Sequence, residues 1–211
     1  VHVIPDSLSY EQASLTEPAA VAVYAVRQSA LKTGDTAAVF GLGPIGLLIV
    51  EALRAAGASK IYAVELSPER QAKAEELGAI VVRPEEGETA VEAIHRLTNG
   101  GVDVSYEVTG VPVVLGQALA AVHKAGECMV VSIWEREANI NPNEFAIQEK
   151  TLKGIIAYRH IFPKVLELME QGYFSAEKLV TKKIKLENII EEGFIELTQD
   201  KSQIKILVEP E

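Results

Sequence analysis

Short apolar runs alternate with amphipathic stretches between residues 36 and 158 of the chain. The apolar runs are rich in Val, Ile and Ala, which is typical of strands that are buried on both faces. The stretches between them place apolar residues at helical spacing and end at glycines such as Gly57 and Gly78. We expect strands at 36–40, 60–65, 80–82, 102–108, 127–133 and 152–158, and helices near 44–56, 68–78, 88–98 and 112–123. This rhythm predicts a doubly wound α/β fold with a six-stranded parallel sheet.

The amino-terminal flank follows a different pattern. Ser9 and Gln12 are spaced as a capping box, which predicts a short helix that begins after Ser9. An Ala- and Val-rich stretch over residues 15–27 predicts a helix that is buried over most of its surface, with Thr16 as its expected N-cap. A minimal α/β domain needs neither element before its first strand. We therefore assign residues 1–33 to a connecting segment from another domain.

The carboxyl-terminal flank also departs from the central rhythm. Two strands around one amphipathic stretch, after a complete sheet, indicate a segment that returns to another layer. We therefore expect residues 34–172 to form the central domain and residues 173–211 to form the returning segment. The predicted elements are a helix at 161–171, a strand at 180–186, an amphipathic stretch at 187–197 and a last strand at 202–208.

Composition and charge disfavour several classes of partner. The chain has 211 residues, of which 48% are hydrophobic, enough for a large buried core. A formal net charge of −10 argues against nucleic acid and anionic membranes, which need clustered Lys and Arg. No apolar run approaches the ~20 residues of a membrane span, and the start lacks a signal-peptide pattern. We expect a cytoplasmic protein, and its single cysteine, Cys128, is predicted to be a core residue.

Three glycines interrupt the pattern between the first predicted strand and the next helix. The loop Gly41-Leu-Gly-Pro-Ile-Gly46 has the spacing G-x-G-x-x-G. Gly41 permits a tight turn, Gly43 lets a pyrophosphate approach the backbone, and Gly46 lets the helix pack closely on the strand. Pro44 suits the first helical turn, and Ile45 follows it. Because free N–H groups at a helix start bind anions, these five residues predict a dinucleotide site in a Rossmann-type fold.

Glu65 ends the next predicted strand, 19 residues after Gly46. A carboxylate at this point can accept hydrogen bonds from both ribose hydroxyls of NAD, whereas the 2′-phosphate of NADP would meet it with like charge. This placement predicts NAD as the cofactor. The alternative is a solvated glutamate beside a structural turn. Arg70 is expected either to lie against the adenine or to be an exposed residue in the first turn of a helix.

The carboxyl ends of later strands complete the expected cofactor site, because ligands of open α/β sheets bind outside these ends. Val108 and Thr109 lie at the end of the fourth predicted strand, Ser132, Ile133 and Trp134 lie at the end of the fifth, and residues 157–159 lie at the end of the sixth. We expect their backbone groups to bind a carboxamide and their side chains to form an apolar wall for a nicotinamide ring. The alternative is that they are ordinary strand-to-loop transitions.

Four stretches of the sequence resemble the zinc-dependent medium-chain alcohol and polyol dehydrogenases, in particular the branch that acts on 2,3-butanediol and sorbitol. They are residues 15–22 (LTEPAAVA), 41–46 (GLGPIG), 103–110 (DVSYEVTG) and 149–159 (EKTLKGIIAYR). The resemblance runs along nearly the whole chain but corresponds to the carboxyl-terminal three-fifths of such an enzyme. In that family an amino-terminal barrel-like domain supplies the Cys and His zinc ligands and much of the substrate pocket.

The resemblance implies roles for two further residues. Glu17 lies where this branch places a carboxylate at or near the catalytic zinc, and the alternative is a first-turn carboxylate that interacts with the helix dipole. Lys205 lies where relatives place a basic residue near the pyrophosphate, and the alternative is a solvent-facing residue of an alternating strand. The histidines show no ligand spacing. We therefore expect the other zinc ligands outside this chain and assign no catalytic residue within it.

Together these features predict the cofactor-binding portion of an oxidoreductase that uses NAD and zinc and acts on a small secondary alcohol, diol or polyol. Zinc in the intact enzyme would polarise the alcohol, while this chain holds the hydride acceptor. The isolated chain is expected to bind NAD without turnover, and the strand at 152–158 is expected to pair in a homo-oligomer, a dimer or a tetramer. The alternatives are a zinc-free quinone or enone reductase and a non-enzymatic NAD-binding module.

Overall fold

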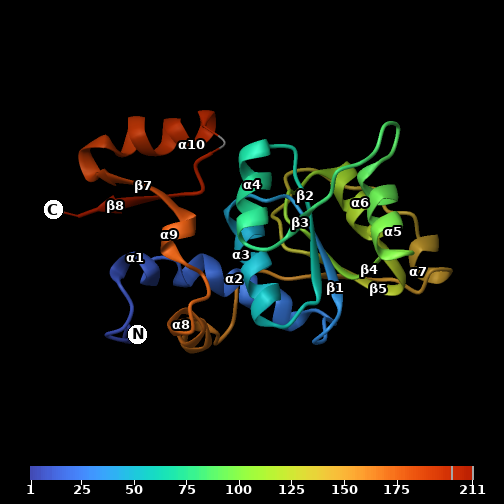
Figure 1. The fold of residues 1–211 in the computed structure, drawn as a ribbon, viewed down its shortest axis with the longest axis horizontal. Coiled ribbons are helices and arrows are strands. Elements are labelled where there is room, and N and C mark those ends of the chain that lie inside the picture. The colour runs from blue at the N-terminus through green and yellow to red at the C-terminus, as the bar shows by residue number, and fades with distance from the viewer. Residues whose placement is uncertain (201, 211) are drawn as a thin grey trace.

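A six-stranded parallel sheet forms the centre of the computed structural model, which describes residues 1–200 and 202–210 (Figure 1). The strands lie in the order β3-β2-β1-β4-β5-β6, the order of doubly wound dinucleotide-binding folds. The predicted α/β fold is therefore confirmed. The strands are β1 (Thr36–Phe40), β2 (Lys60–Val64), β3 (Ile80–Val81), β4 (Val102–Glu107), β5 (Val122–Val130) and β6 (Thr151–Gly154).

Helices cover both faces of the sheet. Side chains alternate along β1, so that Ala37 and Val39 belong to one core cluster while Ala38 and Phe40 belong to the other, and all four are fully buried. The first cluster includes residues of α2 (Thr16–Gln28), α3 (Pro44–Ala55), α4 (Pro68–Glu76) and α8 (Phe162–Glu170). The second includes residues of α5 (Ala90–Thr98) and α6 (Pro112–Ala121), with the short α7 (Asn143–Ala146) beside them.

At the start of one helix the local sequence signal predicts the N-cap correctly, whereas at the start of another tertiary packing determines what the predicted N-cap residue does. Ser9 and Gln12 form the predicted capping box of α1 (Tyr10–Ala13). Thr16, however, is not the N-cap of α2, because that position is taken by Leu15. The Thr16 side chain is buried within the first turn, and its hydroxyl lies 3.7 Å from the sulfur of Met169 on α8. The hydroxyl therefore joins two helices instead of capping one.

Two strands of the central sheet differ by more than one residue from their predicted bounds. β5 begins at Val122 instead of residue 127, and its pairing with β4 shifts register between Val102 and Val104, with Ala125 in a left-handed conformation at φ +64°. β6 ends at Gly154 instead of continuing to residue 158. Ala157 has φ +48°, which is incompatible with an extended strand, so the strand cannot continue through it to residue 158.

The carboxyl-terminal segment forms a separate two-stranded parallel sheet from β7 (Val180–Lys185) and β8 (Lys205–Glu209). In Figure 1 this segment is red and lies at the same end of the molecule as both termini and α1. The predicted amphipathic stretch is helical but is not one α-helix. It consists of a 3₁₀ turn, η1 (Leu186–Asn188), a π-helix, η2 (Ile189–Ile195), and α10 (Glu196–Gln199).

The segment after α8 is attached to the central sheet through buried contacts. Phe174, Leu179 of α9 (Ala176–Leu179) and Ile204 belong to the same core cluster as α3. The carboxylate of Glu51 on α3 also accepts a hydrogen bond from the Phe174 N–H. The division of the chain near residues 33 and 172 remains a prediction. Across residues 1–200 and 202–210, every helix is too short or too polar to cross a membrane.

Candidate functional site

The loop between β1 and α3 leaves the start of a helix open. Gly43 is the N-cap of α3 and has no side chain to cap it, and Pro44 lacks an N–H group. The first-turn N–H groups of Ile45 and Gly46 therefore have no intrahelical acceptor. Gly41 has φ +94°, which turns the chain sharply between strand and helix. These groups form an open helix start, a geometry suited to an anion, at the point where the strand order reverses, between β1 and β4.

Each glycine of this loop meets a different steric environment. A Cβ on Gly46 would lie 1.9 Å from the carbonyl oxygen of Gly41, and a Cβ on Gly41 would lie 2.5 Å from the Thr109 methyl group. A Cβ on Gly43 would meet no atom within 4 Å. Gly41 and Gly46 are thus required by the fold itself. The open space at Gly43 is available to a ligand, which matches its predicted role.

Glu65 ties the end of β2 to the glycine loop. Its Oε2 accepts a hydrogen bond from the Leu42 N–H at 2.8 Å, and its Oε1 accepts from the N–H groups of Leu66 at 2.8 Å and Ser67 at 3.0 Å. A carboxylate offers about four lone-pair sites, and only one donor occupies Oε2 among the described residues. Oε2 therefore retains the capacity to accept from a ribose hydroxyl beside the loop.

A cavity of about 490 Å³ opens beside the helix start. It lies at the carboxyl ends of the strands, as the rule for open α/β sheets requires. Most of the residues predicted to bind the cofactor line it. Its lining consists of Val21, Gly43, Pro44, Ile45, Gly46, Val108, Thr109, Val131, Ser132, Ile133, Ile156 and Ala157.

The other predicted contacts lie in three places. Arg70 is half-buried in the first turn of α4, after the N-cap Ser67, on the Glu65 side of the loop. Lys205 begins β8 and lines a second cavity, of about 330 Å³, together with Pro44 and Ile45, so it lies beside the glycine loop. Trp134 is not brought into the strand-end cavity and instead packs against the α5 and α6 side of the sheet.

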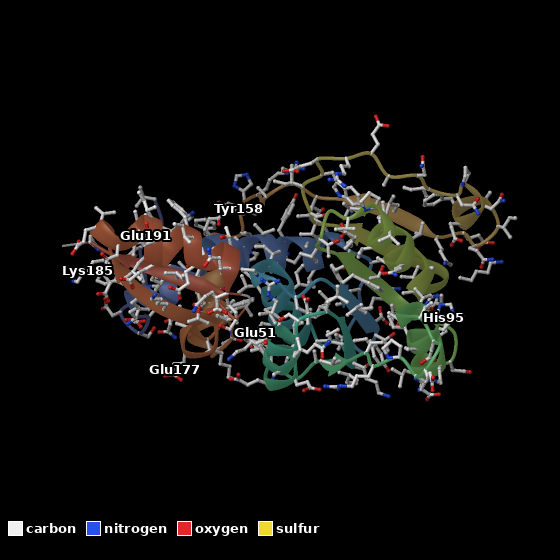
Figure 2. The ribbon with its side chains drawn as sticks, turned by 90° about the horizontal axis from the view of Figure 1, so that it is seen from above. Glu51, His95, Tyr158, Glu177, Lys185 and Glu191 are labelled. Carbon is white, nitrogen blue, oxygen red and sulfur yellow. The ribbon has the colours of Figure 1, made fainter. Side chains whose placement is uncertain are left out.

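Glu17 lies exposed in the first turn of α2 and contacts Tyr158. Partial burial is the largest cause that raises the pKa of the Tyr158 hydroxyl, followed by the Glu17 charge and a hydrogen bond to Glu17. Tyr158 also packs its ring against Phe162, with ring centres 5.0 Å apart, and Figure 2 shows it near the amino-terminal helices. Over residues 1–200 and 202–210, no three His, Cys, Asp or Glu side chains are grouped to hold a metal ion.

Sequence reasoning missed several residues of this site. Val21 comes from α2, which precedes the sheet, and no strand-end rule identifies it. Ile156 enters the cavity because β6 ends early, and it lies next to Ala157, which was expected at the end of the sixth strand. Glu107 was also missed, because β4 already contains the polar residues Asp103 and Ser105, so a further carboxylate does not stand out in the sequence. It is fully buried directly behind the cavity wall.

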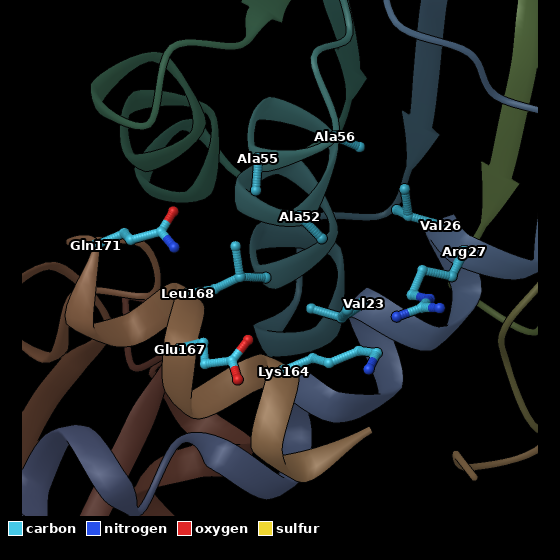
Figure 3. A pocket seen from close by; sticks show the side chains of 10 residues that line it. All are labelled: Val23, Val26, Arg27, Ala52, Ala55, Ala56, Lys164, Glu167, Leu168 and Gln171. Atoms are coloured by element: carbon cyan, nitrogen blue, oxygen red, sulfur yellow. The ribbon is translucent and has the colours of Figure 1, made fainter. Parts of the chain in front are cut away.

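A third cavity, of about 260 Å³, lies between α2, α3 and α8 (Figure 3). Apolar residues such as Val23 and Leu168 line it, and Arg27, Lys164 and Glu167 carry its charges. It borders Ala52, Ala55 and Ala56 at the carboxyl end of α3, whereas the glycine loop lies at the amino end. It is therefore separate from the candidate cofactor site.

The comparisons with known proteins agree with this geometry. A family profile described as zinc-binding dehydrogenase matches residues 44–171. An (R,R)-butanediol dehydrogenase from Bacillus subtilis (strain 168) is 65% identical over 207 residues, which cover 98% of this chain and 60% of that protein. A sorbitol dehydrogenase from the same strain is 36% identical over 213 residues, which cover 100% of this chain and 60% of that protein.

Solved structures show the same relationship. The crystal structure of a 2R,3R-butanediol dehydrogenase from Bacillus subtilis superposes with a TM-score of 0.95 at 65% identity, over 99% of this chain and 60% of that one. A putative zinc-binding dehydrogenase from Sinorhizobium meliloti 1021, solved bound to NADP, gives a TM-score of 0.90 at 26% identity, over 98% of this chain and 61% of that one. The chain thus spans about 60% of the length of these relatives. Because the family profile covers more than half of it, the chain belongs to the zinc-binding dehydrogenase family.

Proposed function

We propose that this chain is the cofactor-binding portion of a zinc-dependent oxidoreductase that transfers hydride between NAD and a secondary alcohol, diol or polyol of the 2,3-butanediol or sorbitol type. One observation carries the proposal: the open start of α3, the Glu65 carboxylate and the strand-end cavity meet at one edge of the sheet. The names of the Bacillus subtilis relatives support the substrate class. Because the chain spans about 60% of those relatives, the activity of the whole protein is part of the proposal.

Different residues of the chain bind different parts of the dinucleotide. The N–H groups of Ile45 and Gly46 bind the pyrophosphate, and Lys205 lies close enough to the loop to add a positive charge. Glu65 accepts from the adenosine ribose through Oε2. The walls after β4 and β5, at Thr109 and Ser132, enclose the nicotinamide end. When bound, the cofactor supplies the carbon that accepts hydride, and the chain supplies its orientation and excludes water.

Glu17 is the zinc contact that we propose within this chain. The described residues do not complete a zinc site around it. The support from the structure is its exposed position on the first turn of α2 and its contact with Tyr158. Val21, one turn further along α2, lines the cofactor cavity. Glu17 is therefore on the same helix that borders the nicotinamide end.

We also propose a homo-oligomer in which β6 pairs across subunits. β6 is the outer strand of the sheet, and Ile156, just beyond it, is 74% exposed. A cytoplasmic location and a dimer or tetramer remain predictions, and sedimentation of the purified protein would decide the assembly. A small-molecule substrate agrees with the dehydrogenase relatives.

A titration with reduced cofactors tests the choice of NAD. The reasoning from Glu65 predicts that the chain binds NADH at least ~10-fold more tightly than NADPH, which corresponds to about 1.4 kcal/mol. Glu65→Gln should narrow this ratio, because the like charge that opposes a 2′-phosphate is gone. Glu69→Gln is the matched control, since it removes an exposed carboxylate from the adjacent helix turn and should leave the ratio unchanged. Comparable affinity of the unaltered chain for both cofactors would overturn the role of Glu65.

A further inference from the structure

Glu107, the last residue of β4, is a carboxylate with no exposed surface. Its Oε1 accepts three hydrogen bonds: from the Thr109 N–H at 2.7 Å, the Thr109 hydroxyl at 2.5 Å and the Gly110 N–H at 3.0 Å. Its Oε2 accepts a fourth from the Ser132 hydroxyl. Within residues 1–200 and 202–210 no basic side chain forms an ion pair with it. Four donors from two loops therefore stabilise the buried carboxyl group.

These two loops form the nicotinamide end of the proposed site. Thr109 and Ser132 both line the strand-end cavity, whereas Glu107 lies behind them. The loops are in close contact, since a Cβ on Gly110 would lie 2.8 Å from the carbonyl oxygen of Ile133. The backbone of Glu107 also binds the second loop, because the Val131 N–H donates to its carbonyl oxygen at 3.0 Å. One residue is thus hydrogen-bonded to both cavity walls.

We propose that Glu107 is a positioning residue that fixes the loops after β4 and β5 at the spacing that a nicotinamide ring requires. This inference rests on the proposed function of the same site. The proposed role depends on the length of the side chain. One terminal oxygen has to reach Thr109 and Gly110 while the other terminal atom reaches Ser132. Charge is secondary, because the Ser132 hydroxyl can either donate to an oxygen or accept from an amide.

Two substitutions test the length and the charge of the Glu107 side chain separately. Glu107→Asp keeps the negative charge but shortens the side chain by one methylene, so it cannot hold both loops at their present spacing. Glu107→Gln keeps the length: its carbonyl oxygen accepts from Thr109 and Gly110, and its amide donates to Ser132. Each purified variant of the chain is titrated with NADH and with ADP-ribose, which has the adenosine and pyrophosphate groups but lacks the nicotinamide.

The proposal predicts that Glu107→Asp weakens NADH binding about 10-fold and changes ADP-ribose affinity less than about 2-fold, with Glu107→Gln close to the unaltered chain for both ligands. Three results would overturn the proposal. An equal loss of affinity for NADH and ADP-ribose would indicate a general structural role, and a larger loss of NADH affinity in Glu107→Gln than in Glu107→Asp would indicate that charge matters more than length. The third is an unchanged NADH affinity in both variants. If Glu107→Asp does not fold, Ser132→Ala replaces it, since that change removes the hydrogen bond from the second loop to the Glu107 carboxylate. The same selective loss of NADH supports the proposal, and an unchanged affinity for NADH refutes it. Failure of the unaltered chain to bind NADH would instead refute the proposed function.

Discussion

Gly46→Ala tests whether close packing of α3 on the glycine loop holds the cofactor site together. The new Cβ would lie 1.9 Å from the Gly41 carbonyl oxygen, and the gap has to widen by about 1.1 Å to reach the 3.0 Å that real contacts respect. The obstructing atom belongs to the backbone of a turn at φ +94°, so the whole loop has to move. Such overpacking costs roughly 1–3 kcal/mol, and the better helix propensity of alanine returns about 0.5–1 kcal/mol.

Because the obstruction is backbone, the cost falls in the upper half of that range, and the expected net loss for Gly46→Ala is about 1–2.5 kcal/mol of unfolding free energy, or a fall in Tm of roughly 2–10 °C for a chain of this size. Gly43→Ala is the matched variant. Its Cβ meets nothing within 4 Å, and its φ of −64° suits alanine. Reduced chain entropy in the unfolded state and the weaker N-cap preference of alanine oppose each other, so we expect a change within about 0.5 kcal/mol. Both variants should lose at least ~10-fold in NADH affinity, Gly46→Ala through a displaced loop and Gly43→Ala through a Cβ where the pyrophosphate approaches.

Urea unfolding measures the stability of the two variants, and NADH titration measures their binding. The reasoning about the pyrophosphate fails if Gly43→Ala binds NADH as tightly as the unaltered chain. The steric argument fails if Gly46→Ala is as stable as Gly43→Ala. ADP-ribose titration serves as the control for the nicotinamide end, because both substitutions should weaken it as much as NADH.

Three further predictions concern the scaffold. Burial lowers the pKa of His123, but hydrogen bonds to a backbone carbonyl and to Asp103 outweigh burial and raise it. The contribution of His123 to the free energy of unfolding is complete below about pH 6.5 and is lost as the pH rises through the raised pKa. The stability difference between the unaltered chain and His123→Gln should therefore be larger at pH 6 than at pH 9, and an equal difference would contradict this. Burial raises the pKa of the Cys128 thiol to about 12, so a thiol reagent should label the chain only in denaturant, and labelling of the folded chain at pH 8 would show that this strand opens. Glu51→Ala should lower the free energy of unfolding in urea by about 1–3 kcal/mol, because it leaves the Phe174 N–H unpaired. The control Glu177→Ala removes an exposed carboxylate and should change the free energy of unfolding little. Equal effects of the two substitutions would show that the Glu51 contact is not stabilising.

The order of elements could be predicted from sequence because buried parallel strands and capped helices leave strong local signals. Ser67, for example, directly precedes Pro68 and caps α4 through its hydroxyl. The strand bounds were harder to predict. The strand predicted at 152–158 ends at Gly154, and the left-handed conformation of Ala157 excludes an extended strand through that residue. Alanine does not signal such a conformation, since only the surrounding packing imposes it.

The same distinction applies to the site. The glycine loop and Glu65 lie in one continuous βαβ unit, so their spacing along the chain determines their position in space. The cavity walls are assembled from segments that are distant in sequence, such as Val21 on α2 and Ile156 after β6. Trp134 illustrates the limit of the strand-end rule. It follows β5 as expected, yet it packs on the other side of the sheet because an apolar cluster is available there.

Glu65 and Glu107 are both carboxylates at the end of a strand, but only Glu65 could be identified as a site residue from the sequence. Both accept hydrogen bonds from backbone N–H groups of the turn that follows their strand. Glu65 is half-buried and keeps acceptor capacity at Oε2, so it resembles the known pattern of a ligand-binding acid. Glu107 is fully buried and its oxygens are already occupied by the protein, so no ligand-based pattern detects it. Because an unpaired buried carboxylate costs several kcal/mol, its retention at this point is best explained by the loops that it holds, and those loops are the walls of the cofactor cavity.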